Sequence, residues 1–101
     1  MKNEVKDCFL NAIKDEEKGK KHKGLLIMGK DDKRARDYIT KAKTNLELCY
    51  FYKEKGFDYK IPEEWFYTLY YCALAILAKF GIESRSQRCT AAFLHYTKEN
   101  N

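Results

Sequence analysis

The sequence lacks the short motifs that mark the common enzyme classes. It has no G-x-G-x-x-G, no phosphate-binding loop with Lys-Ser/Thr, no nucleophile elbow and no H-E-x-x-H. Its two histidines, His22 and His95, have no Asp or Cys partner at a spacing that indicates a catalytic triad. The enzyme classes that carry these motifs therefore lose support.

The four cysteines do not form a recognisable pattern either. They lie far apart, without a C-x-x-C pair and without a histidine spaced to complete a zinc site, so we expect no metal and no cofactor. The chain starts with a charged amphipathic segment rather than an apolar one, so no signal peptide is visible. We predict free, buried thiols in a reducing cytoplasm, in preference to disulfides. The four positions are Cys8, Cys49, Cys72 and Cys89.

Length and charge set the scale of the molecule. A chain of 101 residues is one domain, residues 1–101, with room for one modest core. The 20 Lys and Arg against 15 Asp and Glu leave a net charge of +5. This excess suits an anionic partner, although Lys-rich solvated helix surfaces produce the same balance.

Apolar residues recur with helical spacing along most of the chain, and no pattern of period two is found. We predict helices over residues 3–18, 32–55 and 61–80 and from residue 86 onward. Asp31 and Asp32 are candidate N-caps, and Gly56 and Gly81 are candidate helix ends. The apolar patch 25–28 fits a buried strand or a docking turn, and we favour a helical extension or turn. The predicted fold is an all-α, up-down bundle of about four helices.

Within the third helix, residues 65–80 are apolar on every side. This stretch is slightly short of the ~18–20 residues of a membrane span and contains Thr68, several tyrosines and Lys79, so we expect a soluble core helix and no membrane. Such a helix must be surrounded by the rest of the chain or by another molecule. The other segments cover it only marginally, and we therefore predict a homodimer or higher oligomer through the third and fourth helices.

Two groups of residues are candidates for chemistry. Arg88 and His95 lie seven positions apart, which places them on one helix face, where Arg can hold a phosphate and His can move a proton. Metal-independent RNA cleavage needs that pair of roles, but surface residues beside a core stripe would have the same spacing. A basic surface for RNA or phosphate would form only if the folded chain brings separate basic segments together. For the segment with Lys20, Lys21 and Lys23, a solvated linker is the alternative. The candidate residues of the basic surface are Lys20, Lys21, Lys23, Lys79, Arg85 and Arg88.

Three segments resemble the HEPN family, the "higher eukaryotes and prokaryotes nucleotide-binding" helical domains. They are residues 41–48, the helix 65–80 and the turn 81–89, in which Arg85-Ser86-Gln87 occupies the place of the family's Arg/Lys, Ser/Thr and often His. The resemblance covers about residues 31–96. It implies a helical bundle, commonly dimeric, that acts as an RNase in toxin–antitoxin or defence systems, often beside a nucleotidyltransferase partner.

The chain departs from the family pattern at two points. Gln87 stands where many relatives have His, and the family motif of Arg and His separated by four to six residues normally lies on a later helix. Arg88 and His95 have that separation but lie earlier in the domain, as if a HEPN core were cut short. We therefore consider three functions. The first is a HEPN-like protein that associates with RNA or a nucleotide and that, if it is an enzyme, is a metal-independent ribonuclease. The others are a non-catalytic helical module that partners a nucleotidyltransferase, and a structural oligomer without a ligand.

Overall fold

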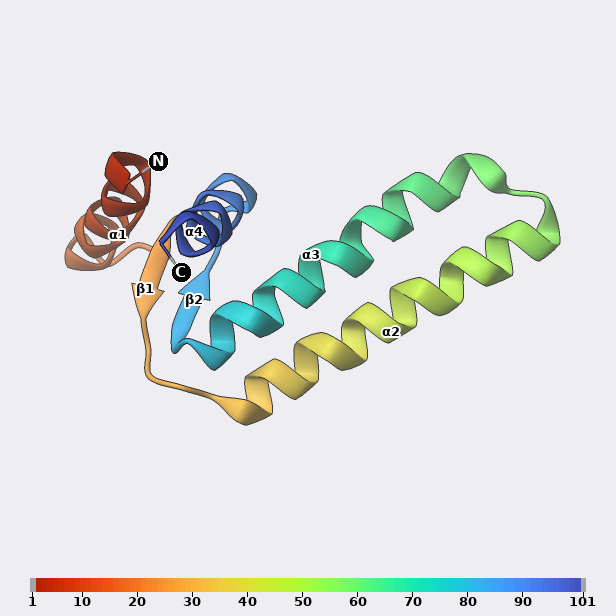
Figure 1. Ribbon diagram of the computed structural model, residues 1–101, viewed down its shortest axis with the longest axis horizontal. Coiled ribbons are helices and arrows are strands. Elements are labelled where there is room, and N and C mark those ends of the chain that lie inside the picture. The colour runs from red at the N-terminus through yellow and green to blue at the C-terminus, as the bar shows by residue number, and fades with distance from the viewer. Residues whose placement is uncertain (1, 101) are drawn as a thin grey trace.

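The computed structural model describes the backbone of residues 2–100 and the side chains of residues 3–100. Helices dominate this part of the chain, which confirms the predicted all-α fold of about four helices (Figure 1). The predicted second helix has the observed bounds, the third helix starts at Ile61 as predicted, and the other predicted helix ends shift by one residue. In chain order the elements are α1 (Lys2–Glu17), β1 (Leu25–Ile27), α2 (Asp32–Lys55), the 3-10 turn η1 (Asp58–Lys60), α3 (Ile61–Lys79), β2 (Ile82–Ser84) and α4 (Gln87–Glu99).

Side-chain caps define where the helices begin and end. The Asp31 carboxylate accepts a hydrogen bond from the Arg34 backbone N–H at 2.9 Å, and the Ser86 hydroxyl accepts one from Cys89 N–H at 3.1 Å. Each cap satisfies a backbone donor that the first helical turn leaves free. Gly56 ends α2 in the left-handed conformation, with φ of 80°, that glycine adopts without strain. The capping predicted from the sequence is thus confirmed at Asp31 and Gly56.

The favoured assignment of the patch at 25–28, a helical extension or turn, is wrong, and the strand at 82–84 was not predicted. Leu25–Ile27 is a strand, and it pairs antiparallel with Ile82–Ser84, with Leu25 opposite Ser84 and Ile27 opposite Ile82. Leu25 is fully enclosed, and Ile82 and Ser84 are buried on the same ladder. A three-residue strand is too short to show alternation, and its partner lies far along the sequence, so local periodicity could not reveal it.

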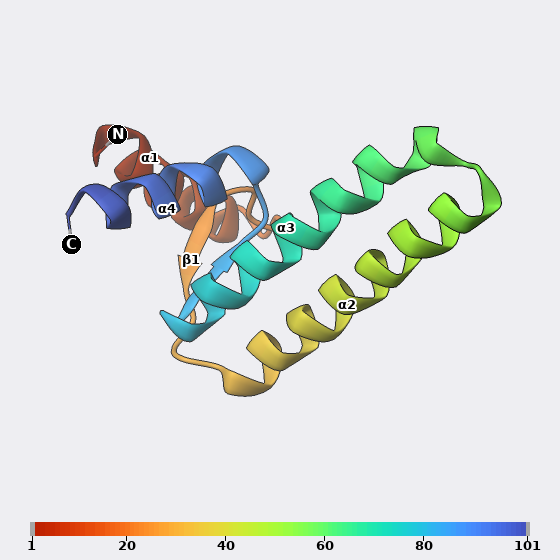
Figure 2. The ribbon, with the colours of Figure 1, turned by 45° about the vertical axis from the view of Figure 1, so that its right-hand side comes forward.

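The molecule consists of two regions of different shape. We call α1, β1, β2 and α4 the body, and α2, η1 and α3 the hairpin. Two views show α1 and α4 side by side at one end, while the antiparallel helices α2 and α3 extend away from them (Figures 1 and 2). The molecule is accordingly elongated, with extents of 47 × 27 × 25 Å.

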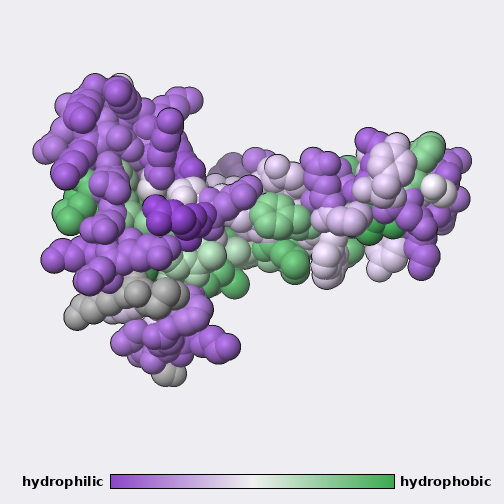
Figure 3. All heavy atoms as spheres, turned by 90° about the horizontal axis from the view of Figure 1, so that it is seen from above, coloured by the Kyte–Doolittle hydropathy of each residue, from purple (hydrophilic) through white to green (hydrophobic). Residues whose placement is uncertain are grey.

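The two regions bury their apolar residues to different degrees. The last turns of α3 enter the body core through Leu77, whereas the small core within the hairpin consists of three alanines packed against Tyr38. The outer face of α3 leaves five large side chains about half exposed, and hydrophobic residues lie open on the projecting hairpin (Figure 3). The rest of the chain therefore covers α3 on only part of its surface. The body core contains Val5, Cys8, Leu25, Leu77, Ile82, Cys89, Ala92 and Phe93; the exposed residues of α3 and its end are Trp65, Phe66, Leu69, Ile76 and Phe80.

A disulfide joins Cys8 of α1 to Cys89 of α4, with 6.0 Å between their Cα atoms. The expectation of four free thiols is therefore wrong for this pair, whereas Cys49 and Cys72 are free. The two bonded residues are 81 positions apart and meet only because α1 packs beside α4. Cysteine spacing along the sequence cannot reveal a contact of this kind.

Within the described residues, we find no helix with the length and apolar character that crossing a membrane requires.

Candidate functional site

The predicted catalytic pair lies on α4, and each member contacts a carboxylate. Arg88 is in the first turn, with 74% of its side chain exposed, and its guanidinium is 3.9 Å from the Glu4 carboxylate of α1. The His95 imidazole contacts Glu99 one turn further along its own helix. Seven residues correspond to about 10.5 Å along a helix axis. The two side chains share a face, as predicted, but each is engaged with its own acidic partner.

The predicted basic residues are only partly brought together. Lys20, Lys21 and Lys23 are exposed in the segment that links α1 to β1. The Arg85 backbone N–H donates to the carbonyl of Gly24 at 3.0 Å, so this segment runs directly beside Arg85. Lys79, in contrast, is bonded to Asp32 of α2 at 2.8 Å. The lysine segment and Arg85 thus approach each other, and a phosphate-binding role for them remains a prediction.

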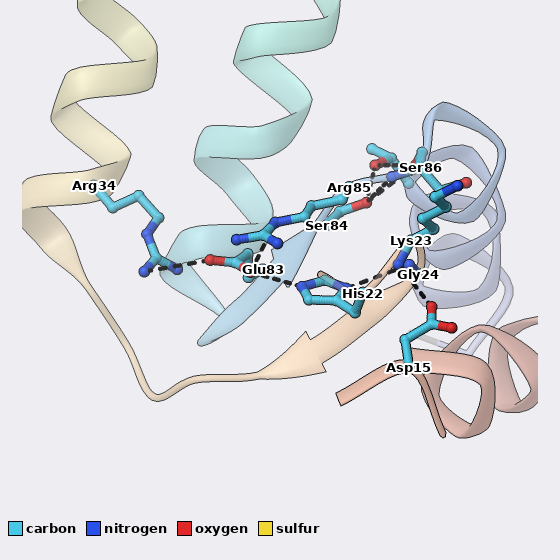
Figure 4. A network of polar contacts seen from close by, with 10 residues as sticks. Asp15, His22, Lys23, Gly24, Arg34, Glu83, Ser84, Arg85 and Ser86 are labelled. Atoms are coloured by element: carbon cyan, nitrogen blue, oxygen red, sulfur yellow. Dashed lines mark hydrogen bonds and ion pairs between the residues drawn. The ribbon is translucent and has the colours of Figure 1, made fainter. Parts of the chain in front are cut away.

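The structure adds a polar cluster around Glu83, shown in Figure 4. His22 is 1% exposed, and its Nε2 is 2.6 Å from Glu83 Oε1. The backbone N–H of Gly24 donates to His22 Nδ1 at 3.3 Å. Because Nδ1 accepts, the ring proton lies on Nε2 and is donated to the carboxylate. His22 therefore fixes the position of Glu83 and has neither ring nitrogen free for catalysis.

Two arginines approach the same carboxylate from different elements. The Arg34 guanidinium of α2 is 3.7 Å from Glu83, and the Arg85 guanidinium is 3.4 Å away (Figure 4). Burial raises the pKa of the Glu83 carboxyl, but the hydrogen bond from His22 and the charges of Arg85 and Arg34 outweigh it, so the pKa lies below its ordinary value. Glu83 is therefore ionised at neutral pH, and two guanidiniums share this one carboxylate.

Aromatic side chains continue the cluster along the hairpin. The rings of Tyr38 and Tyr71 stack, with centroids 6.1 Å apart and 22° between their planes. The Lys41 ammonium lies 5.7 Å from the Tyr38 centroid and 5.5 Å from that of Tyr71. Burial raises the pKa of the Tyr38 hydroxyl, with Arg34 and Glu83 acting on it in opposite directions. We call the set Arg34, Tyr38, Lys41, Tyr71 and Arg85 the tyrosine–arginine surface.

Sequence reasoning placed only Arg85 of this set among the candidate site residues. Arg34, Tyr38 and Lys41 have the spacing of one helix face. Glu83 of β2 and Arg85, which directly follows β2, are two positions apart, the spacing that places side chains on one side of an extended chain. The helical spacing is visible in the sequence, but Tyr38 also packs against the alanine core between α2 and α3, so the spacing indicates a packing role equally well. The strand that presents Glu83 and precedes Arg85 was not expected, so their joint orientation could not be inferred.

A shallow apolar groove of about 440 Å³ runs between α3 and α4. Arg88 borders it, so the predicted catalytic arginine lies beside an apolar surface rather than in a polar cleft. Its apolar lining comes from Phe66, Leu69, Tyr70 and Ala73 of α3 and from Ala91 and Leu94 of α4.

Among the residues that the structure describes, no group of three or more His, Cys, Asp or Glu side chains is arranged to hold a metal ion. No protein-family model matches the chain, and no curated protein or solved structure shows significant similarity to it.

Proposed function

We propose that this chain is a HEPN-like helical protein that associates with RNA or a nucleotide as a component of a toxin–antitoxin or defence system. The observation that carries the proposal is the concentration of arginines at the base of the hairpin, where Arg85 and Arg34 share one carboxylate and Arg88 follows in the next helix. Such a group attracts phosphate through charge-assisted, bidentate hydrogen bonds. The net charge of +5 acts in the same direction.

The test measures the binding of a labelled single-stranded RNA by fluorescence anisotropy, without added metal and at several salt concentrations. We expect the logarithm of the association constant to fall linearly with the logarithm of the salt concentration, because phosphate contacts release counterions. Absence of binding at low salt, to RNA and to a free nucleotide alike, contradicts the proposal.

Ribonuclease activity depends on Arg88 and His95 acting together on one phosphodiester. Their separation along α4 and their contacts with Glu4 and Glu99 favour association without cleavage. In a metal-free cleavage assay, we expect the wild type to leave RNA intact. Cleavage that both Arg88→Ala and His95→Ala abolish would instead establish the ribonuclease.

The groove between α3 and α4 favours a second candidate, a non-catalytic module that partners a nucleotidyltransferase. Leu69→Glu places a charge on this apolar surface, and we expect it to abolish co-purification with a nucleotidyltransferase co-expressed from the same locus. Recovery of the enzyme with the variant as with the wild type would contradict this candidate.

The exposed outer face of α3 supports the proposed homodimer. A large apolar side chain gains about 1.5–3 kcal/mol when it is fully buried, and five such residues on α3 and its end are about half exposed. A structural oligomer without any ligand would satisfy the same demand, and RNA binding distinguishes the two.

We also propose a cytoplasmic location, which places the Cys8–Cys89 bond in a compartment that keeps most thiols reduced. Rapid alkylation during lysis in a denaturant, which exposes the buried thiols, tests this location. Four modified cysteines are expected in the cytoplasm, whereas modification of Cys49 and Cys72 alone indicates an oxidising compartment.

A further inference from the structure

We propose that the tyrosine–arginine surface binds a nucleoside phosphate, either free or as one unit of a single-stranded RNA. The inference rests on the proposed function and adds the site at which the phosphate and the base are held. The surface is formed by residues of α2 and α3 and by Arg85, which follows β2, and it includes neither Arg88 nor His95 of α4.

The phosphate-binding part consists of Arg34 and Arg85. Their distances to Glu83, 3.7 and 3.4 Å, exceed the ~2.7–3.2 Å of an N–H···O hydrogen bond, so the carboxylate orients both groups without using up their donors. Glu83 is itself held by His22, which is buried. The two arginines are therefore placed in advance. The Arg34 guanidinium also lies 3.9 Å from the Asp31 carboxylate, so Arg85, whose side chain is 42% exposed beside Glu83, is the more available donor to a phosphate.

The base-binding part consists of Tyr38 and Tyr71. The two rings are nearly parallel, and both side chains remain partly open to solvent. Proteins bind unpaired bases by stacking them on aromatic rings while cations follow the backbone, and this requires little sequence specificity. Lys41 lies near both rings and supplies a further cation for a neighbouring phosphate.

The far end of the hairpin shows why we assign the site to its base. There Lys60 lies over the rings of Tyr52 and Tyr59, which is also a pairing of a cation with aromatic groups. However, residues 37–84 contain no arginine, so this region has no guanidinium pair. Among the residues that the structure describes, stacked tyrosines lie beside two arginines that one carboxylate orients only at the base of the hairpin.

Substitution of Lys41 provides the cleanest test, because α2 offers a matched control. Lys43 is also exposed and lies two positions further along, about 200° around the helix. Lys41→Gln and Lys43→Gln thus change the net charge equally but on opposite sides of α2. With a labelled single-stranded RNA of about ten nucleotides, we expect Lys41→Gln to weaken binding by about three- to fivefold and to lower the salt slope by about 0.7. Lys43→Gln should match the wild type.

Substitutions of Tyr71 test base stacking. Tyr71→Leu should weaken RNA binding by about tenfold, whereas Tyr71→Phe, which keeps the ring, should retain it. Circular dichroism and thermal melting of each variant check that the helices form, and the exposed Lys41 keeps the test valid if Tyr71→Leu does not fold. Competition with unlabelled adenosine monophosphate and with inorganic phosphate identifies the ligand.

Each outcome of these measurements has a defined meaning. Competition by adenosine monophosphate supports a free nucleotide ligand, and loss of RNA binding in the variants without such competition supports an RNA segment. If inorganic phosphate competes as well as the nucleotide, or if Lys41→Gln and Tyr71→Leu bind RNA like Lys43→Gln, the proposed site is wrong while RNA association by other residues stands. If the wild type binds neither RNA nor nucleotide, the proposed function fails as well.

Discussion

The body and the hairpin differ in how they enclose apolar side chains. In the body core, Leu25 and Leu77, the latter contributed by α3, have no exposed surface, and a disulfide ties α1 to α4 around them. In the hairpin, Trp65 is 48% exposed and Leu69 is 53% exposed, although both lie on a helix rich in apolar residues. The body is thus a closed core, whereas the hairpin presents apolar and aromatic groups outward. We infer that the body supplies the stability and the hairpin the binding surfaces.

Two leucines on α3 provide the largest expected contrast between the regions. Leu77→Ala removes an enclosed side chain from the body core, and we expect it to lower the free energy of unfolding by about 2–5 kcal/mol. Leu69→Ala, on the exposed face of the same helix, should cost less than about 1 kcal/mol in the monomer, because it leaves no enclosed cavity. Urea unfolding of dilute protein measures both. Equal effects would show that the two regions do not differ in this way.

Reduction of the Cys8–Cys89 bond should have the next largest effect. The bond closes a loop across 81 positions, and its loss should lower the free energy of unfolding by about 2–4 kcal/mol. Thermal melting with and without a thiol reductant tests this expectation. A Cys72→Ser variant should keep the dependence on reductant, and a double Cys8→Ser, Cys89→Ser variant should lose it. A wild type that melts identically under both conditions would contradict the structural role of the bond.

Acidification should have the smallest effect, and it acts on Glu83 at the junction of the regions. The folded-state pKa of Glu83 lies below its ordinary value of 4.5, so its contribution to stability is present above that pH and is lost as the pH falls. We therefore expect Glu83→Gln to be less stable than the wild type at neutral pH, with the difference shrinking below pH 4.5. Glu47→Gln, an exposed change on α2, is the control. A constant difference across this range would mean that the ionised carboxylate does not stabilise the junction.

The same division explains what could be predicted from the sequence. The hairpin depends on local signals, and helix 32–55, with its Asp31 cap and its end at Gly56, was predicted with its observed bounds. The body depends on contacts between distant segments: Leu25 with Ser84, and Cys8 with Cys89. No periodicity within three residues predicts the first contact, and no cysteine spacing predicts the second.

The candidate site shows the same limit. Arg88 and His95 share a helix face, as their spacing indicated, but their acidic neighbours Glu4 and Glu99 became evident only in the folded chain. Arg34 and Arg85 are 51 positions apart and meet at Glu83 because α2 packs against α3, which brings the chain that leaves α3 past the start of α2. A site assembled across the chain in this way cannot be found from spacing alone.

The mass of the protein in solution tests most directly whether the hairpin presents a binding face. Light scattering at micromolar concentration should give the mass of a dimer if, as we propose, a second copy covers the exposed face of α3. Leu69→Glu should give a folded monomer, since it places a charge in the middle of that face. A wild-type protein that remains a monomer would contradict the account.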